Sequence, residues 1–555
     1  MLSTTIRGAR LGLAGEGREH SMAEQAVDVL IIGAGASGAA VAWSLADTRM
    51  HILCLEQGDW VRSDTYPGLK ANWELRQAGD FALSPNMRGR REDYPVNDGG
   101  SPISISNFNA VGGSTILYAA HFPRFHPSDF RVRTLDGVGD DWPLDYGQLE
   151  PFYALNDRMT GVSGLAGDPA YPPKEPPLPP VRLGKLGRKL ASGFNKLGWH
   201  WWPSDSAIVT EEYEGRAACI NAGTCMAGCP QGAKGSTDVT YWPAALRAGV
   251  ELRTRCRVRE ITVGPDGMAD GVIYYDENGE EQRQKAEVIV IACNGVGTPR
   301  LLLNSRSPQF PDGLANRSGL VGRNLMFHPY APAIGIFEEP LEGYKGPIGC
   351  SLWSHEFYET DVSRGFVRGF MFEAARGMPP VFEALWALPH GRLPWGDAHH
   401  AAVAALHDRT AALLGICEDL PDPANCVTLD ERLKDSNGIP APKITYRLSE
   451  NSEKMLAFSI ARATEVLKAA GAREVLSESP WKISGWHLMG TARMGTDPER
   501  SVVNEWGRCH DVRNVFIVDG SIFVTSAGVN PCSTIQALAL YIADTMKKNL
   551  ANLFD

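Results

Sequence analysis

The sequence has no excess of basic residues. Its 54 lysines and arginines are outnumbered by 65 aspartates and glutamates, which gives a net charge of −11. Proteins whose main partner is nucleic acid or an anionic membrane rely on the opposite balance. We therefore expect neither of these partners.

Long apolar segments are also missing. Residues 29–46 carry no charge for 18 residues, but their centre is glycine, alanine and serine, so that the hydrophobicity is too low for a membrane helix. The N-terminus has no sustained apolar run before a cleavage site, which excludes a recognisable signal peptide. We expect a cytoplasmic protein without a membrane span, in which residues 1–23 form a flexible extension and Met22 could be the start.

Cysteines are few and odd in number, 11 in 555 residues, and a disulfide framework is not expected. Cys219, Cys225 and Cys229 are nevertheless close in sequence, and Pro230 follows the last of them. Thiolates at such a spacing can hold an iron–sulfur cluster or zinc, although no histidine lies nearby to complete a zinc site. The alternative is three buried or free thiols.

The composition that remains is that of a folded globular protein. Apolar residues make up 43% and charged residues 21%. The 58 glycines and 37 prolines show no collagen-like repeat and predict many turns. The length suggests three or four domains, or two large lobes, and no internal repeat is visible.

The most informative motif is Gly33-x-Gly35-x-x-Gly38. It follows a predicted buried strand at 27–32 and opens a predicted helix at 37–45, and the next apolar run, 51–55, ends in Glu56. In this order the glycines permit a tight turn, close approach of a pyrophosphate and close packing of helix on strand. The helix N-terminus favours the phosphate charge, and Glu56 can accept a hydrogen bond from a ribose hydroxyl. The pattern predicts a dinucleotide site.

Other stretches are open to two interpretations. Gly112-Gly113-Ser114-Thr115 can bind phosphate or face a flat ring, or be an ordinary turn. Thr298 is predicted to begin a helix with Pro299 near its first position. The tryptophans at 199, 201 and 202 could line a sugar pocket or belong to the core, and the core is favoured.

Three further segments are predicted from composition and spacing. The proline-rich residues 165–182 predict an extended connector, and a helix is expected at 183–197. The histidines at 399, 400 and 407 lie in an alanine-rich, helical stretch and are interpreted as structural.

Taken together, the motifs resemble the glucose–methanol–choline (GMC) oxidoreductase family of flavoenzymes. The resemblance covers nearly the whole chain in one order. It rests on GAGASG with Glu56, AVGGST, GVGTPRLLLNS, VGRNLMFHP at 321–329, and the tail segments HLMGTARMG, VDGS and GVNPCSTIQALAL.

The resemblance implies a fold, a cofactor and a reaction. The fold class is α/β, with a Rossmann-like FAD-binding domain and an inserted, α+β substrate-binding domain that carries a mostly antiparallel sheet. The FAD-binding domain would comprise residues 24–130, 215–330 and 481–555, and the substrate-binding domain residues 131–214 and 331–480. The reaction is oxidation of an alcohol to a carbonyl, in which flavin takes a hydride and a protein base takes the hydroxyl proton.

The family's site residues carry over to matching positions in this sequence. His487 is the implied base, because imidazole titrates near neutrality, and Asn530 is implied to orient the same substrate oxygen. The predicted FAD-binding residues are Gly33, Gly35, Ala36, Ser37, Gly38, Glu56, Gly112, Gly113, Ser114, Thr115, Asn294, Gly295, Asp519, Gly520, Asn530 and Pro531. FAD is expected to be noncovalent, since Ile116 and Leu117 stand where some members carry a histidine that bonds to the flavin.

Within the family, DDWPLDYGQLEPFY and the Asn-Pro of GVNP look closest to pyranose oxidases and bacterial FAD sugar dehydrogenases. A sugar or glycoside is therefore the expected donor, and the acceptor is oxygen, a quinone or a protein. The Cys219, Cys225 and Cys229 stretch is similar to the region that holds a three-iron, 3Fe-4S cluster in some bacterial sugar dehydrogenases, which would imply a protein acceptor. It is also similar to a cysteine-rich stretch of relatives without a cluster.

Two further alternatives stay open. The family contains flavin-bearing lyases that cleave cyanohydrins without net redox change. A flavoprotein that only binds a partner is disfavoured by the presence of His487 and Asn530.

Overall fold

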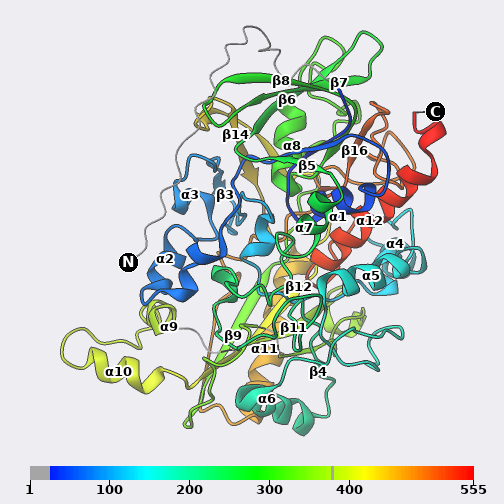
Figure 1. The fold of residues 1–555 in the computed structure, drawn as a ribbon. Coiled ribbons are helices and arrows are strands. Elements are labelled where there is room, and N and C mark those ends of the chain that lie inside the picture. The colour runs from blue at the N-terminus through cyan, green and yellow to red at the C-terminus, as the bar shows by residue number, and fades with distance from the viewer. Residues whose placement is uncertain (1–25, 350, 377–379, 555) are drawn as a thin grey trace, which may run out of the picture.

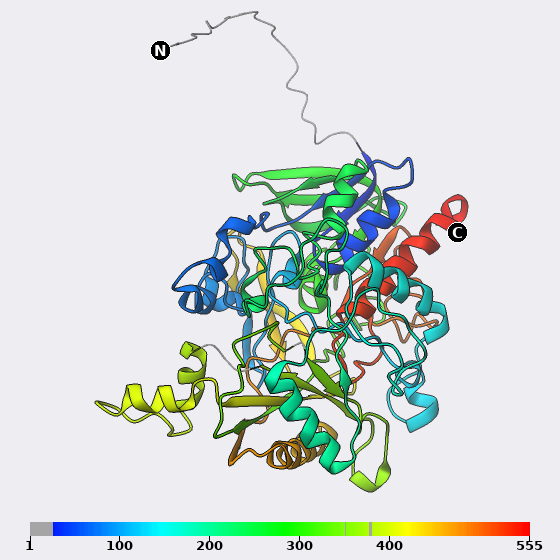
Figure 2. The same cartoon turned by 60° about the horizontal axis from the view of Figure 1, so that its bottom comes forward.

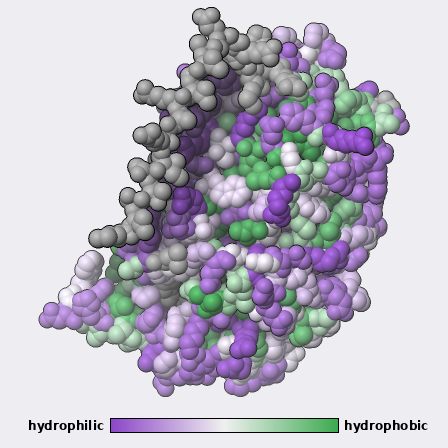
Figure 3. Space-filling model, in the orientation of Figure 1, coloured by the Kyte–Doolittle hydropathy of each residue, from purple (hydrophilic) through white to green (hydrophobic). Residues whose placement is uncertain are grey.

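The computed structural model describes residues 26–349, 351–376 and 380–554 (Figure 1). The predicted N-terminal extension lies outside these residues. Within them, no helix combines the length and apolar character that a bilayer crossing requires. The face drawn in Figure 3 is largely hydrophilic, with apolar side chains in smaller areas between polar ones.

The first sheet has seven strands and contains the predicted Rossmann-like unit. Its order is β5-β2-β1-β8-β7-β6, and β16 also pairs with β8. The pairs of β1 with β2 and with β8 are parallel, as are β2 with β5 and β8 with β16. The strands are β1 (Val27–Ile32), β2 (Ile52–Leu55), β5 (Glu251–Arg253), β6 (Arg257–Val263), β7 (Ala269–Tyr275), β8 (Glu281–Ile291) and β16 (Val515–Ile517).

Strand β8 pairs with its neighbours in two directions along its length. Residues 281–285 pair antiparallel with β7, and their side chains largely alternate between exposed and covered positions. Residues 286–291 pair parallel with β1 and are almost continuously buried. A strand covered on both faces requires such an uninterrupted apolar run, which is why VIVI occupies the second half.

Helices bury the first sheet. α1 (Ala36–Leu45) packs against α12 (Cys532–Lys548) and α7 (Tyr241–Arg247), and α12 in turn packs against α5 (Tyr146–Thr160). α5 begins with a capping box, in which the Asp145 carboxylate accepts from the Gln148 amide N–H while the Gln148 side chain accepts from Asp145 N–H. The uncharged stretch 29–46 is thus a strand, a turn and a helix, and the predicted strand and helix are confirmed.

The second sheet is wholly antiparallel, with strand order β15-β9-β12-β11-β10-β4. α6 (Gly184–Leu197) and α11 (Glu450–Ala469) pack on one of its faces. The predicted α/β class with an antiparallel sheet in the second lobe is therefore confirmed. The strands are β4 (Trp202–Pro203), β9 (Tyr330–Ile336), β10 (Leu352–Ser354), β11 (Phe370–Ala375), β12 (Thr410–Cys417) and β15 (Glu474–Ser477).

Alternation along the central strands separates the two faces of this sheet. Phe370, Phe372 and Ala374 of β11 join the apolar cluster under α6 and α11. Glu373 and Ala375 of the same strand point the other way and line a cavity on the opposite face. The helices thus leave one face of the sheet free to form a site.

A third sheet and several short helices complete the fold. The third sheet has the order β13-β14-β3. α10 projects from the rest of the molecule (Figures 1 and 2), and residues 165–182 contain neither helix nor strand, as predicted. The remaining elements are β3 (Asn97–Gly100), β13 (Cys426–Lys434), β14 (Pro440–Thr445), α2 (Trp73–Ala78), α3 (Pro85–Arg88), α4 (Val132–Asp136), α8 (Asn294–Asn304), α9 (Pro380–Ala387) and α10 (His399–Leu406).

One predicted boundary is wrong. α8 begins at Asn294 rather than at Thr298, so that Pro299 lies inside the helix. Asn294 opens the helix from the left-handed region, at φ +67°, and its side-chain oxygen accepts from the N–H groups of Val296 and Gly297. The carbonyl that loses its helical donor at Pro299, that of Gly295, accepts from the Thr491 hydroxyl at 2.8 Å instead.

Candidate active site

A cavity of about 420 Å³ extends from the first sheet to the second. At one end it touches Ile32, Leu55 and Ala292, where β1, β2 and β8 end. At the other end it touches the free face of the antiparallel sheet. Ligands of parallel α/β sheets bind outside the carboxyl ends of the strands, and the cavity lies at this place.

Most of the predicted site residues line this cavity. Those on its wall are Gly33, Gly35, Ala36, Ser37, Glu56, Gly113, Ser114, Thr115, Asn294, His487, Asp519, Gly520, Asn530 and Pro531. Three predicted residues, Gly38, Gly112 and Gly295, lie outside the wall. A Cβ on Gly295 would lie 2.5 Å from the carbonyl carbon of Leu488, so this glycine serves close backbone packing.

In the first glycine turn, Gly33 and Gly38 each lie so close to a backbone carbonyl that a side chain would not fit. Gly33 has φ +102°, and a Cβ there would lie 2.6 Å from the Ala292 carbonyl oxygen. A Cβ on Gly38 would lie 2.0 Å from the Gly33 carbonyl oxygen. By contrast, a Cβ on Gly35 would meet only the Cα of Gly113, at 4.0 Å. Gly35 therefore keeps open space toward the cavity, while Gly33 and Gly38 serve the turn itself.

The second glycine stretch lies directly against the first. The carbonyl of Ala34 accepts from Gly112 N–H and from the Trp242 indole N–H, both at 2.9 Å. A Cβ on Gly113 would approach the Cα of Gly35 to 2.9 Å. The two glycine stretches thus form one continuous backbone surface at the cavity wall.

Glu56 is buried at the end of β2 and holds the glycine turn. Its carboxylate accepts from the N–H groups of Ala34 and Gly58, each at 2.8 Å. Burial raises the pKa of Glu56, and these backbone hydrogen bonds oppose the rise. The side chain also lines the cavity, where a ribose hydroxyl could donate to it.

Asp519 ties the C-terminal segment to α8. Its carboxylate accepts from the Thr298 hydroxyl at 2.6 Å, from Asn294 N–H at 3.1 Å and from Ser521 N–H at 2.9 Å. Burial raises the pKa of Asp519, and the hydrogen bond from Thr298 is the largest opposing effect. Asp519 therefore sets the relative position of two backbone segments at the cavity wall.

These observations test whether an adenine dinucleotide fits. The wall at Gly35 and Gly113 is bare backbone, a carboxylate stands at the end of β2, and α1 presents its N-terminus at the same end of the cavity. A pyrophosphate needs bare backbone and a helix N-terminus, and a ribose needs an acceptor. The residues present fit FAD.

The predicted base His487 is paired with a second histidine, His328. Their Nδ1 atoms lie 2.7 Å apart. Nε2 of His328 faces two carbonyl oxygens, those of Ala527 at 2.8 Å and Ser526 at 3.1 Å. Carbonyls only accept, so His328 carries its proton on Nε2 and accepts at Nδ1.

This arrangement fixes the tautomer of His487. Burial lowers the pKa of His328 to about 4, so its ring is neutral near pH 7. His487 must then donate from Nδ1, which leaves Nε2 as the unprotonated, basic nitrogen. Burial lowers the pKa of His487 well below its usual value, and nearby His328 and His121 lower it further. At neutral pH the imidazole is therefore unprotonated, with Nε2 free to accept.

Sequence analysis did not single out His328. It lies within VGRNLMFHP, 159 residues from His487. The available signal was a histidine inside a block that already resembles the family's, but nothing in its spacing points to a histidine partner.

We expect His328→Leu to lower kcat by about 10- to 100-fold while FAD stays bound. The substitution removes the acceptor that holds the His487 ring. Displacement of a catalytic group by about 1 Å can lower the rate by roughly 100-fold. Steady-state rates of His328→Leu, His487→Ala and the double variant check this. If the two losses multiply in the double variant, His328 does not act through His487.

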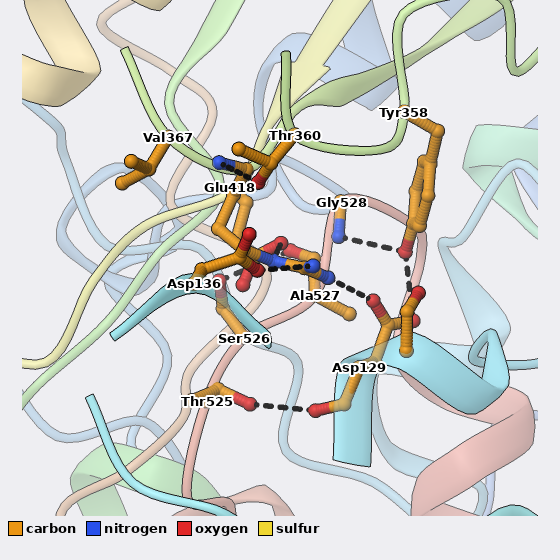
Figure 4. Close-up of polar contacts among 12 residues, drawn as sticks. Asp129, Asp136, Tyr358, Thr360, Val367, Glu418, Thr525, Ser526, Ala527 and Gly528 are labelled. Carbon is orange, nitrogen blue, oxygen red and sulfur yellow. Dashed lines mark hydrogen bonds and ion pairs between the residues drawn. The ribbon is translucent and has the colours of Figure 1, made fainter. Parts of the chain in front are cut away.

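Residues 525–528 form the loop whose carbonyls hold His328, and a buried ion cluster supports this loop (Figure 4). The Arg368 guanidinium donates to Glu418 at 2.9 Å, to Asp136 at 3.0 Å and to Asp129 at 2.5 Å. Burial raises the pKa of Asp129 to about 8, against the opposing charge of Arg368. Loss of Arg368 would leave these carboxyl groups without a cation in a dry environment.

The cluster reaches the loop through Tyr358. The Tyr358 hydroxyl donates to Asp129 at 2.8 Å and accepts from Gly528 N–H at 3.1 Å (Figure 4). The Thr525 hydroxyl donates to the Asp129 carbonyl at 3.2 Å. Residues 525–528 are therefore fixed from one side by the cluster, and their carbonyls fix His328 on the other.

Asn530 follows this loop and faces the same cavity as His487. Its amide nitrogen lies 3.5 Å from the Tyr330 hydroxyl, and its buried amide oxygen has no hydrogen-bond partner. Tyr330 lies near both predicted catalytic residues, since its ring centroid is 6.0 Å from that of His487. A buried, unpaired polar atom on a cavity wall is suited to a ligand.

The tryptophans at 199, 201 and 202 are half-buried and pack against the apolar core clusters from outside. Trp199 packs edge-on against Phe357, and Trp202 donates to the Leu165 carbonyl at 2.8 Å. The cavity wall instead contains Trp386, Trp481 and Trp486, and none of the tryptophans at 199, 201 and 202. The histidines at 399, 400 and 407 are also absent from the wall.

The predicted iron–sulfur site is not supported. Cys219 and Cys225 pack with apolar side chains such as Phe122. Burial raises the pKa of the Cys219 thiol to about 11 and raises that of Cys225. In the described part of the chain, no three cysteine, histidine, aspartate or glutamate side chains come together as metal ligands do. The alternative, three ordinary thiols, fits the structure.

The fold and the cavity define a class of protein. A Rossmann-type unit that fits a dinucleotide opens into a cavity whose far wall carries a neutral, oriented histidine. This arrangement is that of a cofactor-dependent oxidoreductase.

Comparisons with known proteins identify the family. Models described as GMC oxidoreductase match residues 184–330 and 421–539, and a NAD(P)-binding Rossmann-like domain matches residues 31–85. The chain is 42% identical to 2-methyl-1,2-propanediol dehydrogenase of Mycolicibacterium austroafricanum, over 95% of this chain and 96% of that protein. It is 30% identical to the fructose dehydrogenase large subunit of Gluconobacter japonicus, over 94% and 98% of the two chains.

A solved structure, pyridoxine 4-oxidase from Mesorbium loti, shares the fold. Its TM-score is 0.65 at 17% identity, and the match covers 94% of this chain and 99% of that one. The chain belongs to the GMC oxidoreductase family. It is an FAD-dependent enzyme that oxidises CH–OH groups, and the match to a bacterial sugar dehydrogenase agrees with the predicted branch.

Proposed function

We propose that this enzyme oxidises a hydroxyl group of a sugar, a glycoside or a small diol, with His487 as the base and Asn530 as the residue that orients the hydroxyl. The observation that carries the proposal is the oriented His487–His328 pair on the wall of the cavity that fits FAD. The relatives named for a diol and for fructose support the donor class.

The mechanism divides between cofactor and protein. FAD, when bound, supplies the acceptor for the hydride that leaves the carbon. His487 takes the hydroxyl proton on Nε2 while its Nδ1–H stays bonded to His328. Asn530, on the same cavity wall, hydrogen-bonds the substrate oxygen through its amide N–H and so orients the hydroxyl proton toward His487. The apolar walls at Trp486, Ile334 and Ile348 exclude water from the oxygen that loses its proton.

The domain division and the remaining cofactor residues are part of the same proposal. Residues 24–130, 215–330 and 481–555 would hold FAD without a covalent bond, and residues 131–214 and 331–480 would supply the substrate wall. The electron acceptor is one of the three expected from the sequence: oxygen, a quinone or a protein.

Anaerobic flavin reduction tests the proposal. The visible spectrum of the purified holoenzyme is recorded before and after addition of sugars, glycosides, simple alcohols and diols. Bleaching of the flavin band by at least one donor is the expected result. A flavin that no alcohol reduces, together with cleavage of a cyanohydrin, would instead assign the protein to the lyases of the family.

A further inference from the structure

Glu373 is a buried carboxyl group on the cavity wall. It lies on β11, and the alternation along that strand directs it away from α6 and α11 and toward the cavity. Its side chain is 5% exposed. Burial raises the pKa of Glu373 to about 8, and a hydrogen bond from Asn530 lowers it by less. The group is therefore a neutral carboxylic acid near pH 7.

One oxygen of this carboxyl group has no partner. Oε1 of Glu373 makes no hydrogen bond. Nε2 of His121 lies 3.7 Å from this oxygen, which is too far for a hydrogen bond. His121 is itself buried, and burial lowers its pKa to about 3, so it carries no compensating charge. A buried acid with an open oxygen on a cavity wall requires a polar ligand.

The open oxygen is close to the catalytic pair. Asn530 contacts Glu373 on one side and lies near the Tyr330 hydroxyl on the other, at 3.5 Å. The Tyr330 ring in turn lies beside His487. A hydroxyl held between His487 and Asn530 would therefore be separated from Glu373 by a single amide group.

We propose that Glu373 binds a second hydroxyl of the substrate, on the carbon next to the one that is oxidised, and thereby makes the enzyme selective for vicinal diols and polyols. This inference rests on the proposed function, because it needs His487 and Asn530 at the reacting hydroxyl. A neutral carboxylic acid both donates and accepts, as a hydroxyl does, so the two groups pair at both atoms.

The same features argue against a cationic group at this position. An ammonium requires an ionised carboxylate, and the burial of Glu373 without a cationic partner disfavours the ionised form. The neighbouring His121 carries no negative charge that would attract a cation. A hydroxyl can occupy the position without any change of charge in the cavity.

Three molecules with one carbon skeleton test the proposal. They are 2-methyl-1,2-propanediol, 2-methyl-1-propanol and 2-amino-2-methyl-1-propanol, which present a hydroxyl, a hydrogen or an ammonium beside the same CH₂OH group. We expect the holoenzyme to have a kcat/KM for the diol about 10- to 100-fold above that for either of the others. In Glu373→Leu the ratio of diol to mono-alcohol should fall to about 1, and Glu373→Gln, which keeps a donor and an acceptor, should retain part of it.

Glu383→Gln is the matched control. Glu383 is also a buried carboxyl on the cavity wall, but it is already paired with the Thr410 hydroxyl at 2.8 Å and with His407 at 3.2 Å. Its variant should leave the ratio unchanged. The proposal is overturned if the wild-type enzyme does not prefer the diol, if the amino alcohol is preferred, or if Glu373→Leu lowers both rates equally. Failure of the proposed function would look different, since no donor of the wider panel would reduce the flavin.

Discussion

His487→Ala should retain FAD and lose about 10²- to 10⁴-fold in kcat, which is the usual contribution of a general base. The variant removes Nε2 of His487, the ring nitrogen that the contact with His328 leaves unprotonated. Flavin absorbance of the purified variant and steady-state oxidation of the best donor measure the two quantities. His400→Ala, at an exposed position on α10, is the control and should match the wild type.

The pH dependence gives the same assignment a second check. Burial and the neighbouring His328 and His121 hold the pKa of His487 well below its usual value. A lowered histidine pKa keeps the basic form dominant as the pH falls, so the wild-type rate should stay level through pH 6.5 and decline only at lower pH. A full-rate, flavin-bound alanine variant would remove His487 from the mechanism.

Gly35→Ala should fold normally and lose FAD. Its backbone angles, φ −78° and ψ −154°, suit an L-residue, and its Cβ would meet only Gly113 Cα at 4.0 Å. The added methyl group would instead occupy the space where the fold brings a pyrophosphate to bare backbone. Overpacking of about 1–3 kcal/mol corresponds to FAD binding that is weaker by roughly 5- to 150-fold.

Gly38→Ala is the matched contrast. Its Cβ would lie 2.0 Å from the Gly33 carbonyl oxygen, so the turn itself must shift and the free energy of unfolding should fall. Thermal unfolding and the FAD-to-protein ratio separate the two variants. If Gly35→Ala keeps a full complement of FAD, the cofactor does not lie against this turn.

The first sheet and its glycine turn could be predicted because their determinants are local. β1, the turn and α1 occupy residues 27–45, and Glu56 follows the next strand. Uninterrupted apolar runs predict strands covered on both faces, and the glycine spacing predicts the turn between them. The predicted strand at residues 27–32 therefore agrees with β1 at both ends.

The start of α8 shows where local rules fail. Pro299 suggested a helix that begins at Thr298, because proline is favoured in the first turn. The helix begins four residues earlier because Thr491, distant in sequence, satisfies the Gly295 carbonyl. A tertiary hydrogen bond thus overrides a local preference.

The iron–sulfur site predicted from the cysteine spacing is not supported, for a related reason. Three cysteines within eleven residues allow a cluster, but a cluster also needs three thiolates directed to one point. In the structure, Cys219 and Cys225 pack among apolar side chains, and the described residues contain no group of three potential metal ligands. Spacing alone carries no information about that environment.

By itself, the sequence determined the dinucleotide turn and the acid after β2, and family resemblance predicted His487 and Asn530 as the catalytic pair. Only the tertiary structure decided what surrounds that pair. His328 reaches His487 across 159 residues. The Arg368 cluster supports residues 525–528 through Tyr358, and the helices on one face of the second sheet leave Glu373 on the other. Contacts of this kind join positions without a fixed spacing in sequence, and whether a strand residue faces a helix or a cavity depends on what packs on each face of its sheet.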